Sequence, residues 1–342
     1  MADTEDNCNG PRADPFEGSI GLRIGAIFII WASSTAITLF PILTKRVSRF
    51  NIPASAFDFA KYFGSGVIIA TAFIHLLDPG IDELSSPCLN SNFQNYPFAL
   101  AFAMISLFLT FIVEFLAFRF GSSLANRLAY DPHSGGHHHA SEHVTSGHNE
   151  KSSEEGALAK KESSDSAVDL EKDQLSLSAQ AQEILGVVIL EFGVVFHSFI
   201  IGITLGTTEQ SGFVQLFIVI IFHQMFEGLG LGSRLAFLPL QMKTWIPTVG
   251  ALTYGLVTPI GLAIGIGVRN TYNGDGATAN YVTGIFDSFS AGILLYTGTV
   301  ELLAHEFIFN DKMRKAPISK VIISIVEMMT GAGIMALLGK WA

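Results

Sequence analysis

The side chains best suited to chemistry lie in apolar stretches in the second half of the chain. His223 and Glu227 stand four residues apart in HQMFE, so a helix would place an imidazole and a carboxylate on one face. His197, followed by Ser198, lies in the preceding apolar stretch and would face this pair if the two helices pack together. Two imidazoles and one carboxylate would form a three-ligand site for a transition metal, with positions left open for water.

The composition indicates what surrounds these side chains. Of 342 residues, 49% are hydrophobic and only 15% are charged, whereas soluble domains carry about 25% charged residues. Lys and Arg are absent between residues 61 and 119, 172 and 234, and 269 and 312. Such runs predict membrane-spanning segments and exclude a soluble enzyme. A balance of 20 basic against 30 acidic residues, without a basic patch, also excludes a nucleic-acid-binding protein.

Eight apolar segments are each close to the roughly 20 residues that a helix needs to cross a bilayer. They cover residues 20–43, 57–77, 98–120, 184–206, 214–232, 246–267, 281–303 and 321–338. The strict alternation typical of barrel strands is absent. The sequence therefore predicts an all-α membrane protein, an eight-transmembrane-helix bundle.

The chain between the third and fourth segments has a different composition. Residues 131–180 are rich in Ser, Glu, Lys and His and contain no aromatic residue. Such a segment cannot bury enough apolar surface to fold alone, so we expect a disordered loop. The predicted organisation is an N-terminal tail (1–19), three spans (20–130), the His-rich loop and five spans (181–342).

The basic residues indicate the orientation of the bundle. With the N-terminus outside, 16 of the 20 Lys and Arg residues fall on inner segments. The positive-inside rule therefore places both termini outside the cell and the His-rich loop in the cytoplasm. Cys8 and Cys88 then both face the oxidising side, which fits a disulfide, with two unpaired thiols as the other interpretation.

Ionisable residues inside membrane spans are usually functional, because a charge in a bilayer costs several kcal/mol. Here no Lys or Arg lies deep in a span to pair with them. A buried carboxylate without a basic partner must be protonated, hydrogen-bonded or neutralised by a bound cation. Hydrogen bonding between helices remains the alternative to metal binding. The set consists of His75, Asp78, Glu114, Glu191, His197, His223, Glu227, Asp287, Glu301, His305, Glu306 and Glu327.

Two segments resemble a known family signature. HSFIIGITLG (residues 197–206) and HQMFEGLGLG (residues 223–232) are similar to the paired motifs of the Zrt-/Irt-like (ZIP) divalent-metal transporters. The C-terminal GAGIMALLGKWA resembles the fungal plasma-membrane zinc transporters in particular. The likeness covers essentially the whole chain. It implies a multi-pass plasma-membrane protein with external termini, whose spans form one transport domain, often as a homodimer, with metal between the fourth and fifth helices.

The resemblance also assigns individual residues. It places the metal site on three ligands with two flanking residues: His197, His223, Glu227, Ser198 and Gln224. Many relatives carry further polar or acidic side chains where this chain has Ser198, Ile201 and Gln224. We therefore expect one metal ion rather than two.

Further residues are assigned to the path on either side of the site. His305 and Glu306 resemble the family's exit-side ligands, and Glu301, about one turn earlier, continues their helical face. His75 and Asp78, near the outer end of the second span, are expected to guide ions inward. The alternative is that all five only meet interfacial solvent.

The His-rich loop is expected to bind Zn²⁺ weakly, because its imidazoles are mobile and exposed. The alternative is a solvated linker in which the histidines are incidental. They are His133, His137, His138, His139, His143 and His148.

The predicted function is uptake of Zn²⁺ into the cytoplasm by alternating access around a mid-membrane site. No nucleotide-binding loop is present, so ATP does not drive transport directly, and Zn²⁺ is the substrate rather than a cofactor. The alternatives are transport of Fe²⁺ or a broad range of divalent metals, and a metal sensor without flux. A di-iron oxidase is excluded, because the spans lack paired Glu-x-x-His motifs.

Overall fold

The computed structural model describes residues 8, 19–46, 53–128, 184–238, 245–269, 273 and 276–341. The chain divides into two compact units, one made of residues 1–111 and 186–342 and the other of residues 112–185. The regular structure of the described residues is entirely helical. This confirms the predicted fold class. The predicted His-rich loop lies outside the described residues.

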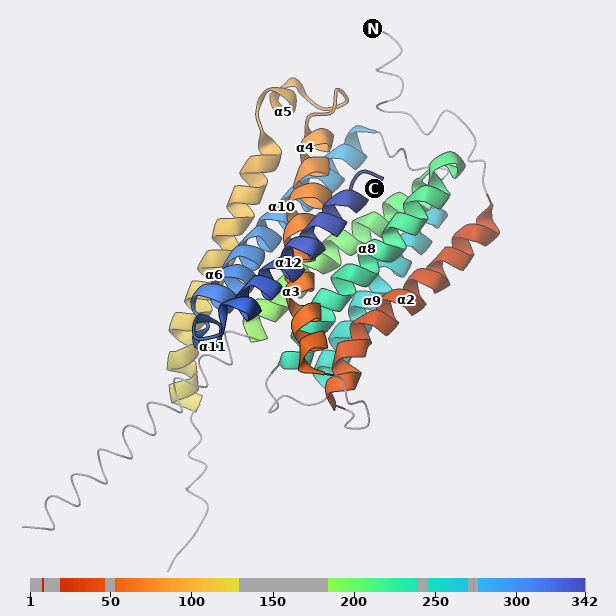
Figure 1. Cartoon of the computed structure of the whole chain (residues 1–342). Coiled ribbons are helices and arrows are strands. Elements are labelled where there is room, and N and C mark those ends of the chain that lie inside the picture. Colours follow the sequence, from red (N-terminus) through yellow and green to blue (C-terminus); the bar gives the residue numbers. More distant parts are fainter. Residues whose placement is uncertain are drawn as a thin grey trace, which may run out of the picture. The chain divides into compact units, whose positions relative to one another are not determined.

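Long helices lie side by side in the first unit (Figure 1), and α6 continues from it into the second. The elements, in chain order, are α2 (Ile20–Arg46), α3 (Ala54–Ala70), η1 (Thr71–Leu77), α4 (Asp78–Leu84), α5 (Ser91–Asn95), α6 (Phe98–Leu128), a helix over Ile184–Thr207, α8 (Gln210–Phe237), α9 (Trp245–Val268), α10 (Ala277–Tyr296), η2 (Thr297–Ile308), α11 (Asp311–Arg314) and α12 (Ile318–Leu338).

Seven helices in the described part of the chain are long and apolar enough to cross a membrane. They match all the predicted segments except 281–303. That segment is helical too, within α10 and η2, but α10 carries buried polar side chains such as Asn280, Asp287 and Ser290. These lower its mean hydropathy, because the helix faces other helices rather than lipid alone.

Glycines allow close helix packing at the centre of this unit. Gly202 and Gly206 of the 184–207 helix lie against Gly261 and Gly265 of α9, where added methyl groups would meet the opposing backbone. Each pair is spaced four residues apart, the small-xxx-small pattern that permits close contact between membrane helices. The 184–207 helix and α9 therefore approach each other at backbone distance.

The glycine run of α8 serves the same purpose on two sides. Gly228 and Gly232 lie against Thr38 of α2, while Gly230 lies against Gly64 of α3. The run therefore makes α8 a central helix that both α2 and α3 contact closely.

The helix that begins with α3 is interrupted by a π-helical turn, η1, before it continues as α4. Pro79, near the start of α4, explains the interruption. Proline has no N–H to donate to the carbonyl of His75, and its ring crowds that carbonyl. The local widening places His75 in a π-helical turn, a feature that is frequent at functional sites.

Arg23 lies in the first turn of α2. The structure buries this side chain completely. Its guanidinium donates to the carbonyls of Leu205, Gly206 and Thr208 at 3.1, 3.2 and 2.6 Å and lies over the Phe213 ring. Arg23 thus satisfies the free carbonyls at the end of the 184–207 helix and joins α2 to that end.

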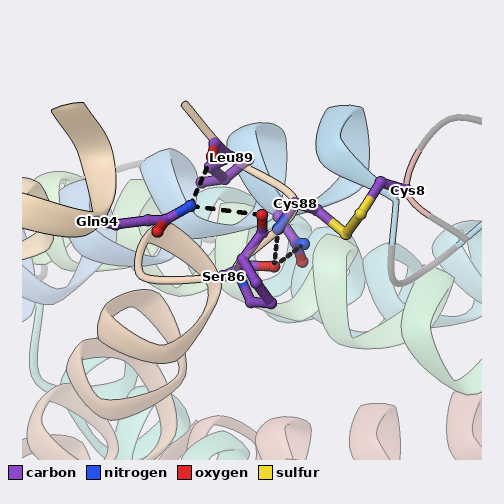
Figure 2. Close-up of a disulfide and its surroundings, with 7 residues drawn as sticks. Cys8, Ser86, Cys88, Leu89 and Gln94 are labelled. Carbon is purple, nitrogen blue, oxygen red and sulfur yellow. Dashed lines mark hydrogen bonds between the residues drawn. A yellow bond between two sulfur atoms is a disulfide. The ribbon is translucent and has the colours of Figure 1, made fainter. Parts of the chain in front are cut away.

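A disulfide joins Cys8 to Cys88, which lies between α4 and α5 (Figure 2). The two Cα atoms are 5.2 Å apart. Cys88 is held by a hydrogen bond from its N–H to the Ser86 hydroxyl, and Gln94 donates to the Leu89 carbonyl at 2.8 Å. The bridge therefore ties the N-terminal segment to an ordered turn above α4.

Candidate metal site

Three side chains from two helices meet in the interior of the first unit. His197 comes from the 184–207 helix, and His223 and Glu227 come from α8; all three are buried. The Nε2 atoms of the two histidines are 3.3 Å apart, and His223 Nε2 is 3.5 Å from Glu227 Oε1. One ligand atom from each residue lies within 4.8 Å of the others. The structure thus brings together the three residues that the sequence predicted as ligands.

The Glu227 carboxylate lacks the hydrogen bonds that a buried carboxylate needs. The residue is 1% exposed, and neither Oε1 nor Oε2 makes a hydrogen bond of full geometry to a described residue, although the hydroxyls of Thr71 and Tyr254 lie close to the carboxylate. Such groups are rare in folded proteins, because leaving a buried acceptor unsatisfied costs about 1–3 kcal/mol, and more for a charge. A cation held between the carboxylate and the two imidazoles would remove this deficit. The donor set of two nitrogens and one oxygen suits Zn²⁺.

His75 lies beside this group. Its ring packs edge-on against that of His223, with centroids 4.8 Å apart. Its Nε2 is 2.9 Å from the Met335 carbonyl of α12. Because a carbonyl only accepts, His75 Nε2 carries the hydrogen and Nδ1 keeps a lone pair. Asp78, predicted as its partner in guiding ions, is exposed on α4.

The flanking pair Ser198 and Gln224 makes contacts between helices. Ser198 Oγ donates to Gln224 Oε1 at 3.4 Å, and the Tyr254 hydroxyl lies 2.9 Å from the Gln224 backbone carbonyl and 3.2 Å from the same Oε1. The Gln224 amide in turn donates to the Thr258 hydroxyl. Both ends of this amide are therefore occupied, and it joins α8 to the 184–207 helix and α9. Gln224 supports the site and offers no free atom for a second metal.

Asp287 of α10 is a residue near the site to which the sequence assigned no role. Its Oδ1 lies 3.7 Å from His197 Nδ1, and the residue is 5% exposed. It appeared among the intramembrane ionisable residues. Spacing along the chain, however, could not show that it faces His197.

The predicted exit-side residues are arranged differently. Glu306 is paired with Lys61 of α3 and, at 2.7 Å, with Arg234 of α8. Arg234 also donates to the Ser65 hydroxyl at 2.7 Å. The expectation that no basic residue pairs with the intramembrane acids is therefore wrong for Glu306. Lys61 and Arg234 lie near helix ends, and the bundle brings these ends together around the carboxylate.

The remaining predicted residues lie elsewhere. Glu301 lies against Gly186 at the start of the 184–207 helix, and His305 is exposed on η2. Neither belongs to the group formed by His197, His223 and Glu227. The loop histidines, from His133 to His148, lie outside the described residues.

Comparison with known proteins explains why this constellation is present. The sequence profile of the family described as "ZIP Zinc transporter" matches residues 20–339. The chain is 39% identical to Zinc-regulated transporter 1 of Saccharomyces cerevisiae, over 96% of this chain and 89% of that protein. It is 34% identical to Zinc-regulated transporter 2 of the same yeast, over 99% and 98%. It is 33% identical to Zinc transporter 3 of Arabidopsis thaliana, over 98% and 90%.

The chain belongs to the ZIP zinc transporter family. Membership confirms the resemblance that the paired motifs indicated. It also makes the chain a multi-pass membrane transporter of zinc rather than an enzyme. In this ZIP protein the two motifs lie on the two helices that supply the buried imidazoles and carboxylate.

Proposed function

We propose that this ZIP protein carries Zn²⁺ from outside the cell into the cytoplasm through a site made of His197, His223 and Glu227. The observation that carries the proposal is the convergence of the buried Glu227 carboxylate with two imidazoles, with neither carboxylate oxygen in a hydrogen bond of full geometry to a described residue. The names of the relatives, zinc-regulated transporters and zinc transporters, support zinc as the substrate.

The chemistry of transport follows from the ligands. Zn²⁺ arrives hydrated, and three protein ligands replace only part of the water shell, so the ion is held but not trapped. Neutral imidazole and ionised carboxylate are the binding forms, so binding competes with protons. Gly202 and Gly206 give the ligand-bearing 184–207 helix a smooth contact with α9, across which it could move during alternating access.

Location and orientation are part of the same proposal. The relatives and the C-terminal resemblance favour the plasma membrane, and the basic residues favour external termini. The disulfide between Cys8 and Cys88 supports an external N-terminus, because disulfides persist on the oxidising side of a membrane. A homodimer stays a prediction from the family resemblance.

The test is zinc uptake into vesicles that contain only this protein. We expect wild-type proteoliposomes to accumulate radiolabelled zinc, and the variant Glu227→Gln to lose at least about 10-fold in rate, because it keeps the shape but not the charge. Glu209→Gln is the matched control, since Glu209 precedes the same helix and is exposed. Full uptake by correctly inserted Glu227→Gln would refute the site.

The same assay separates the alternatives. A sensor without flux would give wild-type vesicles that bind zinc but do not accumulate it. A broad-range transporter would show competition by each of Fe²⁺, Mn²⁺ and Cd²⁺, because His and Glu ligands bind many divalent metals and do not select one of them sharply.

A further inference from the structure

Asp287 of α10 lies directly behind one of the proposed zinc ligands. Its Oδ1 is 3.7 Å from His197 Nδ1, and both side chains are buried. Neither of these two atoms has a hydrogen-bond partner among the described residues. His197 Nδ1 and the Asp287 carboxylate oxygen thus face each other across this distance.

The two nitrogens of an imidazole lie on different edges of the ring, which decides what Asp287 can do. His197 Nε2 faces His223, while Nδ1 faces Asp287. Asp287 is not part of the compact group formed by the three ligands. The carboxylate therefore lies on the far side of the ring from the metal position and contacts the ligand rather than the ion.

The packing of α10 against the 184–207 helix fixes this arrangement. Gly193 leaves room for Leu294 of α10, so the two helices approach closely one turn from His197. The residues just before the pair also stack: the rings of Phe196 and Phe286 are 5.5 Å apart and nearly parallel. A short Asp side chain can then reach the imidazole, and a movement of less than about 1 Å would complete a hydrogen bond.

We infer that Asp287 is a positioning residue: it accepts the Nδ1–H of His197 and so holds this imidazole in the tautomer whose Nε2 lone pair binds the ion. Metal-binding histidines commonly donate their second N–H to a carboxylate or carbonyl, and loss of that partner typically weakens metal binding by 10–100-fold. The arrangement parallels that of His75, whose second nitrogen is fixed by the Met335 carbonyl. This inference rests on the proposed zinc site.

The first test uses the wild-type protein and needs no metal. Purified chain with ¹⁵N-labelled histidine is examined by NMR, and the His197 signals are assigned by their loss in His197→Ala. We expect Nδ1 of His197 to carry the hydrogen and Nε2 to lack it. A hydrogen on Nε2 instead would overturn the inference, whatever the variants do.

The second test measures zinc affinity with a competing chelator. Asp287→Asn should bind Zn²⁺ about 10–100-fold more weakly, because the amide can present an N–H to Nδ1 and favour the wrong tautomer. Ser290→Ala, which changes a buried polar residue of the same helix, should bind like the wild type. Wild-type affinity in Asp287→Asn would overturn the inference.

A double-mutant cycle shows whether Asp287 acts through His197. In a His197→Ala background, Asp287→Asn should cause no further loss of zinc affinity. An equal loss in both backgrounds would show that Asp287 acts independently, as a direct ligand or in packing, and would overturn the inference. If wild-type protein binds no zinc, the proposed function fails, while the NMR result still decides the role of Asp287.

Discussion

At the scale of single residues, the site combines complete and incomplete hydrogen bonding. Gln224 has partners for both ends of its amide, in Ser198, Tyr254 and Thr258. Glu227, three residues later and equally buried, makes no hydrogen bond of full geometry to a described residue through either oxygen. The first arrangement holds helices together, whereas the second costs free energy until a cation arrives. The contrast supports a structural role for Gln224 and a ligand role for Glu227 in the proposed site.

This contrast predicts how zinc changes thermal stability. Zinc at a hundred times its Kd should stabilise the wild-type protein by about 2.7 kcal/mol, because the folded state alone holds the site. Glu227→Gln should lose this stabilisation. Without metal, it should melt at or above the wild-type temperature, because a buried unpaired charge is gone. Melting curves of purified protein with zinc and with a chelator give both values, and a variant still stabilised by zinc would contradict the assignment.

The sequence could predict which three side chains converge but not which residues surround them. His223 and Glu227 follow from spacing along one helix, and His197 from the paired motifs. His197 faces Asp287 through one edge of its ring, and His75 packs on His223. Both contacts depend on how helices that are distant in sequence pair and on how each is rotated about its axis. Spacing within a single helix holds no information about that rotation.

At the scale of helices, close contact is made possible by residues without side chains. Gly261 of α9 lies against the backbone of Phe199 and Gly202, whereas Gly267 on the same helix has open space around its Cα. Gly261→Ala should therefore push the helices apart and cost about 1–3 kcal/mol, as overpacking does. Gly267→Ala should be neutral or slightly stabilising, because Ala favours a helix. Yield of monodisperse protein and melting temperature measure both, and equal losses would contradict the packing.

The three-residue ion cluster that joins α3, α8 and η2 makes a second prediction at this scale. Glu306→Gln leaves Lys61 and Arg234 partly buried without a counter-charge and should destabilise the protein by about 3 kcal/mol. Asp311→Asn is the control, because its pair with Arg314 is 77% and 64% exposed and worth at most about 1 kcal/mol. Denaturation in detergent compares the two. If both variants unfold alike, the cluster does not hold these helices together.

At the scale of the whole molecule, the apolar segments of the sequence predicted where helices occur, but not where each helix ends or how apolar it is. The helix from Ala54 to Leu84 extends beyond the predicted 57–77, because polar residues continue it past the apolar core. Segment 281–303 is helical but, unlike the seven candidate spans, lacks a sufficiently apolar stretch, and α10 carries buried polar side chains such as Asp287. Mean hydropathy detects helices that face lipid, and it weakens for a helix that lines the interior.

The orientation of the chain across the membrane can be tested through the disulfide, because its two cysteines can be labelled only after reduction. Cys8 and Cys88 are paired, so the native chain offers no free thiol. If both lie outside, a membrane-impermeant phosphine followed by an impermeant maleimide should label the wild-type protein on intact cells. The variant Ser152→Cys adds one thiol to the His-rich loop, and without reduction it should react only after permeabilisation. This result would place the loop in the cytoplasm, as the positive-inside rule requires. The opposite orientation would give two opposite results. Ser152→Cys would be labelled on intact cells, and Cys8 and Cys88 would be reduced and labelled only after permeabilisation.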